Sequence, residues 1–250
     1  MSAKNDIGQG RRKFLQAAAT AAAGLALGSV LLATRAAANG GGMKIGVIGS
    51  GRIGGTLGSL WVKAGHEVLF SARNLDEVRK VIEGLGPKAR AGTPQEAAAF
   101  GDVILISVPY SALPQIGKDL AAELKGKVVL DTCNPIPRRD GPMAEAARAK
   151  GTGVASPENL PGVRLVRAFN SVGARFLQSE AHRAGEKVAI PLAADDPAAL
   201  KIASRLVEDA GFEPVAVGPL ARAIEFDTGT PVYGKALTAR ELRKGLGIGS

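Results

Sequence analysis

Short apolar runs alternate with amphipathic stretches from residue 44 to the end of the chain. Lys44–Ile48 is one such run, and Arg52–Lys63 after it carries Ile53, Leu57 and Trp61 at helical spacing. Further runs typical of strands are Glu67–Ser71, Val103–Ser107, Lys127–Asp131, Val163–Ala168, Lys187–Leu192 and Glu213–Val217. Strands that alternate with helices indicate an α/β protein, with a mainly parallel sheet covered on both faces.

Helix start and stop signals fill the segments between these runs. Thr93 and Glu96 form a capping box with Pro94 at the first helical position, and Thr238 and Glu241 form a second box. The remaining helices are predicted near 74–84, 111–124, 142–150, 173–183, 196–210 and 219–225. The pattern predicts a core of about residues 43–172 and a small C-terminal extension of about residues 173–250.

The six residues that follow the first strand and run into the first helix carry a glycine motif: Gly49, Ser50, Gly51, Arg52, Ile53 and Gly54. In a strand–turn–helix unit this spacing is the dinucleotide fingerprint of the doubly wound Rossmann fold. The first glycine permits the tight turn, the second lets a pyrophosphate approach the backbone, and the third lets helix and strand pack closely. The helix N-terminus then offers free N–H groups to phosphate.

The end of the second strand indicates which dinucleotide binds. It reads Ser71, Ala72, Arg73, Asn74, and no carboxylate appears before Asp76. An NAD site usually has Asp or Glu here, whereas a 2′-phosphate is accommodated by arginine. We therefore predict NADP(H), with Ser71 and Asn74 adding hydrogen bonds. The alternative is a solvated Arg73 that only follows the strand.

The ends of the later strands should face the same ligand, because ligands bind outside the carboxyl ends of strands in such sheets. Tyr110 is expected either to stack on a ring or to fill the rim of the core. Asn134 and Asn170 are each expected either to bond the nicotinamide carboxamide or to cap the following helix, with the cofactor favoured for Asn170 and capping for Asn134. The candidate cofactor-binding residues at these ends are Val108, Pro109, Tyr110, Asn134, Phe169 and Asn170.

Residues 1–38 read as a targeting segment. Gly10–Gln16 resembles a twin-arginine export signal, residues 14–34 are uncharged, and Ala36–Ala38 offers a signal peptidase site. We expect recognition by the twin-arginine export machinery, cleavage after Ala38 and a periplasmic location. An uncleaved segment of this length would instead act as a membrane anchor.

Charge and cysteine usage exclude several other classes of function. The formal net charge is +9, but residues 1–38 hold five basic residues and one acidic residue, which leaves about +5 on the remainder. No Lys/Arg run typical of nucleic-acid binding occurs. Cys133 is the only cysteine, and His66 and His182 are the only histidines, so no metal site is predicted. We expect all three to be structural or solvated.

Several stretches together resemble the NADP reductases that use the deazaflavin coenzyme F420. They are Lys44–Asn74, Val108–Tyr110, Asp131–Pro135, Val166–Ser171 and Pro231–Tyr233, and the resemblance covers most of residues 43–250. It implies a Rossmann domain that moves hydride between NADPH and the deazaflavin, often as a homodimer. In better-known members the second strand ends in Ser-Arg-Arg, whereas Ala72, Arg73 and Asn74 stand here.

Hydride transfer between two bound rings asks a protein for proximity and exclusion of water rather than for a nucleophile. No catalytic side chain is therefore predicted. The function expected is that of an NADP(H)-dependent oxidoreductase whose small-molecule hydride acceptor is a deazaflavin or flavin. The alternatives are a non-catalytic NADP(H)-binding sensor, or an NADPH-dependent reductase of a quinone, a metal or another small molecule. A hydroxyacid or imino-acid dehydrogenase would need a longer helical substrate domain.

Overall fold

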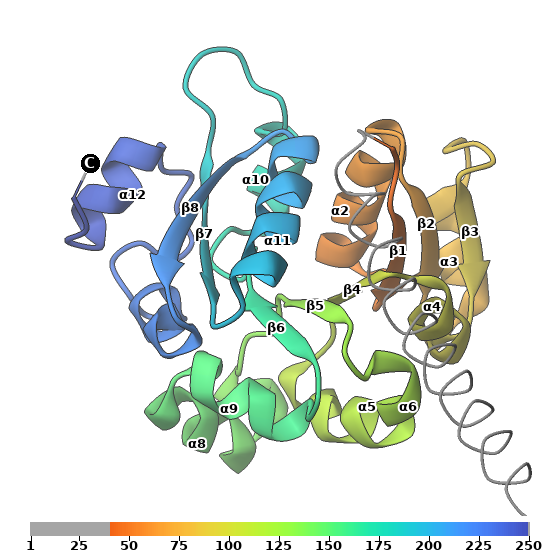
Figure 1. Ribbon diagram of the computed structural model, residues 1–250, viewed down its shortest axis with the longest axis horizontal. Helices are drawn as coiled ribbons and strands as arrows, with labels where there is room; N and C mark the ends of the chain where they lie inside the picture. The colour runs from red at the N-terminus through yellow and green to blue at the C-terminus, as the bar shows by residue number, and fades with distance from the viewer. Residues whose placement is uncertain (1–40, 250) are drawn as a thin grey trace, which may run out of the picture. The chain divides into compact units, whose positions relative to one another are not determined.

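The computed structural model describes residues 41–249, so the predicted export signal lies outside the described residues. These residues form an eight-stranded sheet in the order β3-β2-β1-β4-β5-β6-β7-β8 (Figure 1). Every neighbouring pair is parallel except β6 and β7, which run antiparallel. The strand order reverses between β1 and β4, which confirms the predicted doubly wound α/β fold.

The strands are short, as buried parallel strands usually are. Their bounds are β1 Lys44–Ile48, β2 Glu67–Ser71, β3 Ala89–Gly92, β4 Val103–Ile106, β5 Val128–Asp131, β6 Arg164–Arg167, β7 Ala189–Ala194 and β8 Glu213–Gly218. Most of the strands match the predicted ones to within a residue or two. β3 was not predicted, because it is a four-residue edge strand without an apolar run.

The helices connect the strands and cover both faces of the sheet. Their bounds are α2 Arg52–Lys63, α3 Leu75–Ile82, α4 Pro94–Phe100, η1 Tyr110–Ala112, α5 Leu113–Asp119, α6 Ala121–Leu124, α7 Pro137–Asp140, α8 Pro142–Lys150, α9 Thr152–Asn159, α10 Ala174–Ser179, α11 Pro197–Asp209, η2 Leu220–Phe226 and α12 Ala239–Gly245. Both predicted capping boxes are present, at Thr93 and at Thr238. None of the described helices is long and apolar enough to cross a membrane.

Alternate residues of each strand point to opposite faces, so the sheet separates two apolar cores. On one face α2 and α11 pack over Val47, Phe70 and Leu105. On the other face α4, α5 and α9 pack over Ile48, Ile104 and Ile106. Burial on both faces holds the central strands rigidly, which fixes the positions of the loops at their carboxyl ends.

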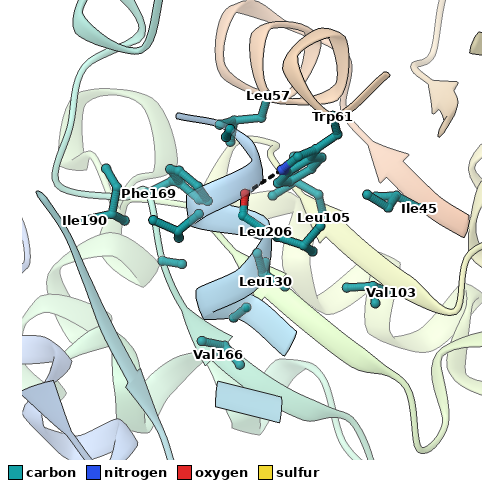
Figure 2. Close-up of a cluster of buried hydrophobic side chains, with 14 of the residues drawn as sticks. Ile45, Leu57, Trp61, Val103, Leu105, Leu130, Val166, Phe169, Ile190 and Leu206 are labelled. Carbon is teal, nitrogen blue, oxygen red and sulfur yellow. Dashed lines mark hydrogen bonds between the residues drawn. The ribbon is translucent and has the colours of Figure 1, made fainter. Parts of the chain in front are cut away.

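Trp61 joins α2 to the C-terminal half of the chain. Its indole Nε1 donates a hydrogen bond to the carbonyl oxygen of Leu206 in α11, at 2.7 Å (Figure 2). The rings of Trp61 and Phe212 both meet Phe169 edge to face, with centroids 6.3 and 6.2 Å from it. Buried aromatic pairs of this geometry add to the stability that burial alone provides.

The predicted extension continues the same sheet. β7 pairs with β6, β8 pairs with β7, and α11 packs on the face that α2 also covers. A third apolar cluster lies under η2 and α12, and it includes Val215, Phe226 and Val232. The extension is therefore part of the same sheet as the core. The loop between η2 and α12 returns to the carboxyl edge of that sheet.

Candidate functional site

The turn between β1 and α2 is tied to the end of β2 by hydrogen bonds. The backbone N–H groups of Gly49 and Ser50 both donate to the Ser71 carbonyl oxygen at 2.9 Å, and the Ser50 hydroxyl donates to the same oxygen at 3.0 Å. The Ser71 hydroxyl in turn donates to the Val47 carbonyl at 2.8 Å. Ser71 thus holds the glycine turn in place, and its buried side chain is not available to a ligand, which corrects the expectation of a direct contact.

The three glycines of the motif meet three different requirements. Gly49 has a φ of +98°, and a side chain there would also overlap the Ser107 carbonyl. A side chain at Gly54 would overlap the Gly49 carbonyl. A Cβ at Gly51 would meet no protein atom within 4 Å. The turn is therefore packed tightly on its inner side and open at Gly51, as a phosphate-binding turn must be.

The N-terminus of α2 lies directly behind that opening. Gly51 is its N-cap, so no side chain caps the first N–H groups, and the first turn holds no acidic residue. Uncapped N–H groups and the positive end of the helix dipole together favour a bound anion. The exposed Arg52 and the half-buried Ile53 begin this helix. The residues present fit a dinucleotide pyrophosphate.

The β2 end presents the candidate for the ribose phosphate. Arg73 is exposed, and it makes no ion pair within residues 41–249. Ala72 is half-buried beside it. Asn74 caps α3 by accepting a hydrogen bond from the backbone N–H of Asp76 at 3.0 Å. Arg73 is therefore unengaged and can turn toward a 2′-phosphate, while the Asn74 oxygen is already used in the cap. NADP(H) binding by these residues stays a prediction.

A hollow of about 490 Å³ runs along the outer side of α2 from the glycine turn. Ser50, Gly51 and Arg52 form one end of it, and Lys63 forms the other. Leu177 of α10 is part of its apolar lining. The side chains of Arg52 and Lys63 are exposed, so they add positive charge to the hollow next to the predicted phosphate site.

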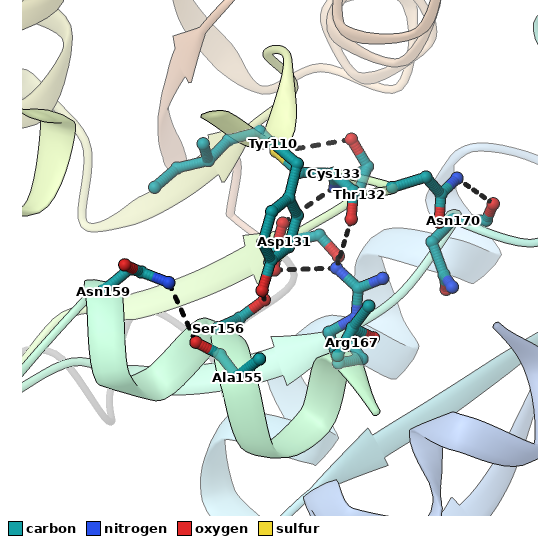
Figure 3. Close-up of polar contacts among 12 residues, drawn as sticks. Tyr110, Asp131, Thr132, Cys133, Ala155, Ser156, Asn159, Arg167 and Asn170 are labelled. Carbon is teal, nitrogen blue, oxygen red and sulfur yellow. Dashed lines mark hydrogen bonds and ion pairs between the residues drawn. The ribbon is translucent and has the colours of Figure 1, made fainter. Parts of the chain in front are cut away.

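At the end of β4, Val108 and Pro109 lie at the surface, and Tyr110 does not. Tyr110 is fully buried, and its hydroxyl shares a hydrogen bond of 3.3 Å with the Ser156 hydroxyl of α9 (Figure 3). Burial raises the pKa of Tyr110 to about 12. Of the two alternatives for Tyr110, the structure supports the core and not stacking on a cofactor ring.

Phe169 and Cys133 are also interior residues. Phe169 is fully buried between Trp61 and Phe212, with a φ of +57° at the exit of β6. Its side chain cannot contact a dinucleotide, so the prediction for Phe169 is corrected to a role in the core. Burial raises the pKa of the Cys133 thiol well above its ordinary value, so this group stays protonated and unreactive, as expected for a packed cysteine.

Asn134 does not cap a helix, contrary to the prediction, because α7 begins only at Pro137 after Ile136. The Asn134 amide nitrogen instead donates to the Asn170 carbonyl at 2.7 Å and to the Tyr233 hydroxyl at 3.3 Å. The Asn134 side chain thus connects the exit of β5 to the exit of β6 and to the loop after η2. Its Oδ1 is buried without a hydrogen-bond donor among the described residues.

Asn170 occupies the end of β6, where the sequence predicted a cofactor contact. It is 2% exposed, and its amide nitrogen donates to Asp227 Oδ1 at 3.2 Å. Its Oδ1 likewise has no donor within the described residues. A buried acceptor of this kind is costly unless a partner satisfies it. Protein atoms cover both amide oxygens in this structure, so contact with a ligand N–H would require the surrounding groups to move.

Three buried charged side chains, Asp131, Arg167 and Asp227, form a cluster at these strand exits. Arg167 is fully buried, and its Nη1 lies 2.7 Å from Asp131 Oδ2 (Figure 3). Its Nη2 lies 3.5 Å from Asp227 Oδ1. Arg167 Nη1 also donates to the carbonyl oxygens of Asp131 and Cys133, at 3.0 and 3.1 Å. Asp227 accepts from the backbone N–H and the hydroxyl of Thr152, at 2.8 and 2.6 Å. The cluster fixes the exits of β5 and β6 relative to the loop after η2.

Sequence reasoning missed Asp227, Thr152 and Arg167 as residues that organise the site. Arg167 ends an apolar strand, and an arginine in that position is commonly solvated. Asp227 lies in a loop with no local motif, and its partners Thr152 and Asn170 are 75 and 57 residues away in sequence. The signal available was Asp131 at the end of a buried strand, since a buried carboxylate requires a cationic partner.

Two histidines lie away from this edge. His66 is buried at the start of β2, where its Nδ1 accepts from the Met43 backbone N–H at 2.9 Å and its Nε2 lies 3.0 Å from Asp209 Oδ2. His182 follows α10 with a φ of +56°. Within the described residues no cluster of His, Cys, Asp or Glu could hold a metal ion.

Residues 44–135 match a family model described as NADP oxidoreductase coenzyme F420-dependent. The chain is 29% identical over 188 residues to metalloreductase STEAP3 of Rattus norvegicus. The aligned region covers 74% of this chain and 36% of that protein. The chain is also 28% identical over 204 residues to the F420-dependent NADP reductase of Methanothermobacter thermautotrophicus. That aligned region covers 76% of this chain and 87% of that protein. The chain is thus similar in sequence to NADP-dependent oxidoreductases.

The solved structures agree on the architecture. A protein of Sinorhizobium meliloti described as hypothetical superimposes with a TM-score of 0.66 at 24% identity, and covers 79% of this chain and 95% of that one. At this identity the likeness shows the fold alone. The chain corresponds to about a third of the rat metalloreductase but to most of the archaeal NADP reductase.

Proposed function

We propose that this protein is an NADPH-dependent reductase that passes hydride to a planar heteroaromatic acceptor of the deazaflavin or flavin type. The observation that carries the proposal is the glycine turn, which is open at Gly51 in front of an uncapped helix N-terminus, with the unengaged Arg73 at the next strand end. When bound, NADPH supplies the hydride.

The chain's own residues divide the work of binding along the carboxyl edge of the sheet. The turn at Gly51 and the N–H groups of α2 bind the pyrophosphate, and Arg73 binds the 2′-phosphate as an arginine can and a carboxylate cannot. β5 lies two strands from β1, about 10 Å away by ordinary strand spacing. Asn134, at the exit of β5, is thus at the distance that the nicotinamide end of a dinucleotide would reach, and Asn170 lies one strand further, at the exit of β6.

The acceptor would lie over the half-buried Val108 and the exposed Pro109, which form a mainly apolar edge at the exit of β4, next to the strand whose exit carries Asn134. An apolar surface would exclude water from the nicotinamide and acceptor rings. Hydride transfer depends mainly on this exclusion of water and on a short distance between the two rings. The name of the archaeal relative, an F420-dependent NADP reductase of similar length, supports a deazaflavin acceptor. The name of the rat relative, a metalloreductase, supports a route to metal that would need parts of that longer protein.

An acceptor screen tests the proposal. Purified protein is mixed with NADPH and, in separate reactions, with oxidised coenzyme F420, FMN, FAD, a quinone and a ferric chelate, and the loss of NADPH absorbance is followed. The proposal expects fastest oxidation with the deazaflavin or a flavin. Tight NADPH binding without oxidation by any acceptor would indicate a sensor and would contradict the proposed activity.

We further propose that the protein is exported by the twin-arginine route. The support is the pair Arg11 and Arg12 ahead of an uncharged stretch of residues 14–34 and the small residues Ala36–Ala38. This route carries folded proteins, which suits a chain that must bind its dinucleotide before it leaves the cytoplasm. The exported protein would then either retain the dinucleotide tightly or use another hydride donor.

A further inference from the structure

The loop after η2 brings a tyrosine to the carboxyl edge of the sheet. The backbone N–H of Gly234 donates to the Ser171 carbonyl at 2.7 Å, and Val232 is buried in the C-terminal core. Tyr233, between these two anchors, is half-buried, and its hydroxyl meets the Asn134 side chain at 3.3 Å. Its hydroxyl therefore lies at the exit of β5, beside the predicted position of the nicotinamide.

The hydrogen bond between Asn134 and Tyr233 has a defined direction. The Asn134 amide nitrogen is the donor to both the Asn170 carbonyl and the Tyr233 oxygen, so the tyrosine oxygen accepts and its own hydrogen is not used in this contact. In the part of the chain that the structure describes, no other group is recorded within hydrogen-bond reach of the Tyr233 hydroxyl. The phenolic hydrogen can thus be donated to a ligand.

Neighbouring groups keep this hydroxyl protonated. Burial raises the pKa of Tyr233 above the ordinary value of a phenol, and the carboxylate of Asp227 raises it further, while Arg139 and Arg167 act in the opposite direction. Three further buried oxygens without donors lie on the same loop and strand exits, namely Asn170 Oδ1, Thr228 Oγ1 and Thr230 Oγ1. The surroundings are polar and partly shielded, as a proton-transfer site requires.

We infer that Tyr233 is the proton donor to the reduced acceptor, and that Asn134 is the positioning residue that orients its hydroxyl. This inference rests on the proposed reductase function and adds a catalytic residue to it. It also defines the class of acceptor as neutral heteroaromatic or quinoid molecules, whose reduction to the dihydro form takes up one hydride and one proton.

When bound, NADPH would supply a hydride with its electron pair, which would form a C–H, N–H or O–H bond on the acceptor and leave the acceptor as an anion. The Tyr233 O–H bond breaks, its proton forms the second new bond on a nitrogen or oxygen of the acceptor, and solvent returns a proton to the phenolate. The sum is NADPH, acceptor and one proton giving NADP⁺ and the dihydro acceptor.

The test compares two acceptors in the wild type and in Tyr233→Phe. A neutral quinone or deazaflavin needs hydride and a proton, whereas a cationic N-methylphenazinium dye becomes neutral on taking hydride and needs no proton. Tyr233→Phe should slow reduction of the neutral acceptor by roughly 100-fold or more, since a general acid usually contributes about 100- to 10,000-fold. It should leave dye reduction and the Kd for NADPH within about twofold, because hydride delivery is unaffected.

Two further measurements separate chemistry from structure. The chain has two tyrosines, so ultraviolet titration of phenolate absorbance in Tyr233→Phe leaves only Tyr110, and the step that disappears reports Tyr233 directly. Tyr110→Phe removes the other, structural hydroxyl and should not change the ratio of the two acceptor rates. Asn134→Asp should slow the neutral acceptor more than the dye, because a carboxylate would accept the tyrosine hydrogen.

The outcomes distinguish the two proposals. If wild-type protein binds NADPH but reduces neither acceptor, the proposed function fails and the role of Tyr233 fails with it. If the wild type is active and Tyr233→Phe slows both acceptors equally, or neither, only the inference about Tyr233 is overturned. Selective loss with the neutral acceptor supports both.

Discussion

Arg167 and Asp131 form a fully buried ion pair, with 2.7 Å between Nη1 and Oδ2, at the carboxyl ends of β6 and β5. Asp227 adds a second carboxylate at 3.5 Å from Nη2. A buried pair contributes little net stability over an apolar replacement, but loss of one member leaves a buried charge without compensation. The cluster therefore serves mainly to hold three segments in one arrangement.

Arg167→Leu should lower the free energy of unfolding by about 3–5 kcal/mol, because it leaves Asp131 and Asp227 buried without their cation. Urea unfolding followed by circular dichroism measures this. Arg79→Ala is the matched control, since Arg79 pairs with Asp76 at 2.6 Å on the surface, with 66% and 79% of the side chains exposed. Equal shifts in the urea midpoint for the two variants would contradict the structural role assigned to Arg167.

The glycine turn offers a contrast within one motif. Gly51→Ala should fold normally, because its Cβ meets nothing within 4 Å, yet it should weaken NADPH binding at least about tenfold, since the methyl group lies where the pyrophosphate approaches the backbone. Gly54→Ala should instead destabilise the fold by about 1–3 kcal/mol, because the methyl group overlaps the Gly49 carbonyl. Fluorescence titration and thermal melting separate the two effects. Normal NADPH binding by Gly51→Ala would exclude the turn as the phosphate site.

His66 should make stability depend on pH. Its Nδ1 accepts from the Met43 N–H, so the neutral ring carries its proton on Nε2, and burial lowers its pKa although Asp209 opposes this while Arg205 and Lys88 reinforce it. The unfolded chain then binds more protons than the folded one below the ordinary value of about 6.5. The contribution of His66 to the free energy of unfolding is expected to be fully present above that pH and to be lost as the pH falls toward the pKa of His66 in the folded protein.

Urea midpoints measured between about pH 8 and about pH 5 test this. The His66→Gln variant keeps a neutral side chain at the position and should flatten the decrease in this range. A wild-type midpoint that is constant, or that falls equally in the variant, would show that His66 does not contribute the effect.

The predicted export signal makes a separate claim. Full-length protein expressed in a bacterium with a twin-arginine system should appear in the periplasm with Asn39 as its first residue. Replacing Arg11 and Arg12 by lysine should retain it inside the cell. Periplasmic protein that is unchanged by this replacement would contradict the twin-arginine route, and a full-length membrane-bound product would support the anchor alternative.

Local signals predicted the parts of the fold that depend on local interactions. Arg52–Lys63 is a helix with the predicted bounds, and the capping boxes at Thr93 and Thr238 form because their partners are three residues away. β7 begins two residues later than predicted, and it carries Pro191 in its interior. α9 was not predicted, since Pro157 lies within it and its apolar spacing is weak.

In the candidate site, too, the sequence predicted the parts that depend on local interactions and missed those that depend on distant contacts. The glycine turn and the end of β2 follow from a contiguous motif, so the sequence placed them correctly at one edge. The role of Asn134 depends on Tyr233, 99 residues away, and the burial of Tyr110 and Phe169 depends on packing against distant helices. No local pattern contains those contacts, which is why stacking and capping were the natural expectations.

The central claim is that the glycine turn and Arg73 together bind NADP(H). The most direct measurement is isothermal titration of NADPH and NADH into the mature protein and into Arg73→Glu. The account predicts a lower Kd for NADPH than for NADH in the wild type, and loss or reversal of that preference in the variant, because a carboxylate repels the 2′-phosphate and accepts from the 2′-hydroxyl. Equal affinities for the two dinucleotides in the wild type, or an unchanged preference in Arg73→Glu, would contradict it.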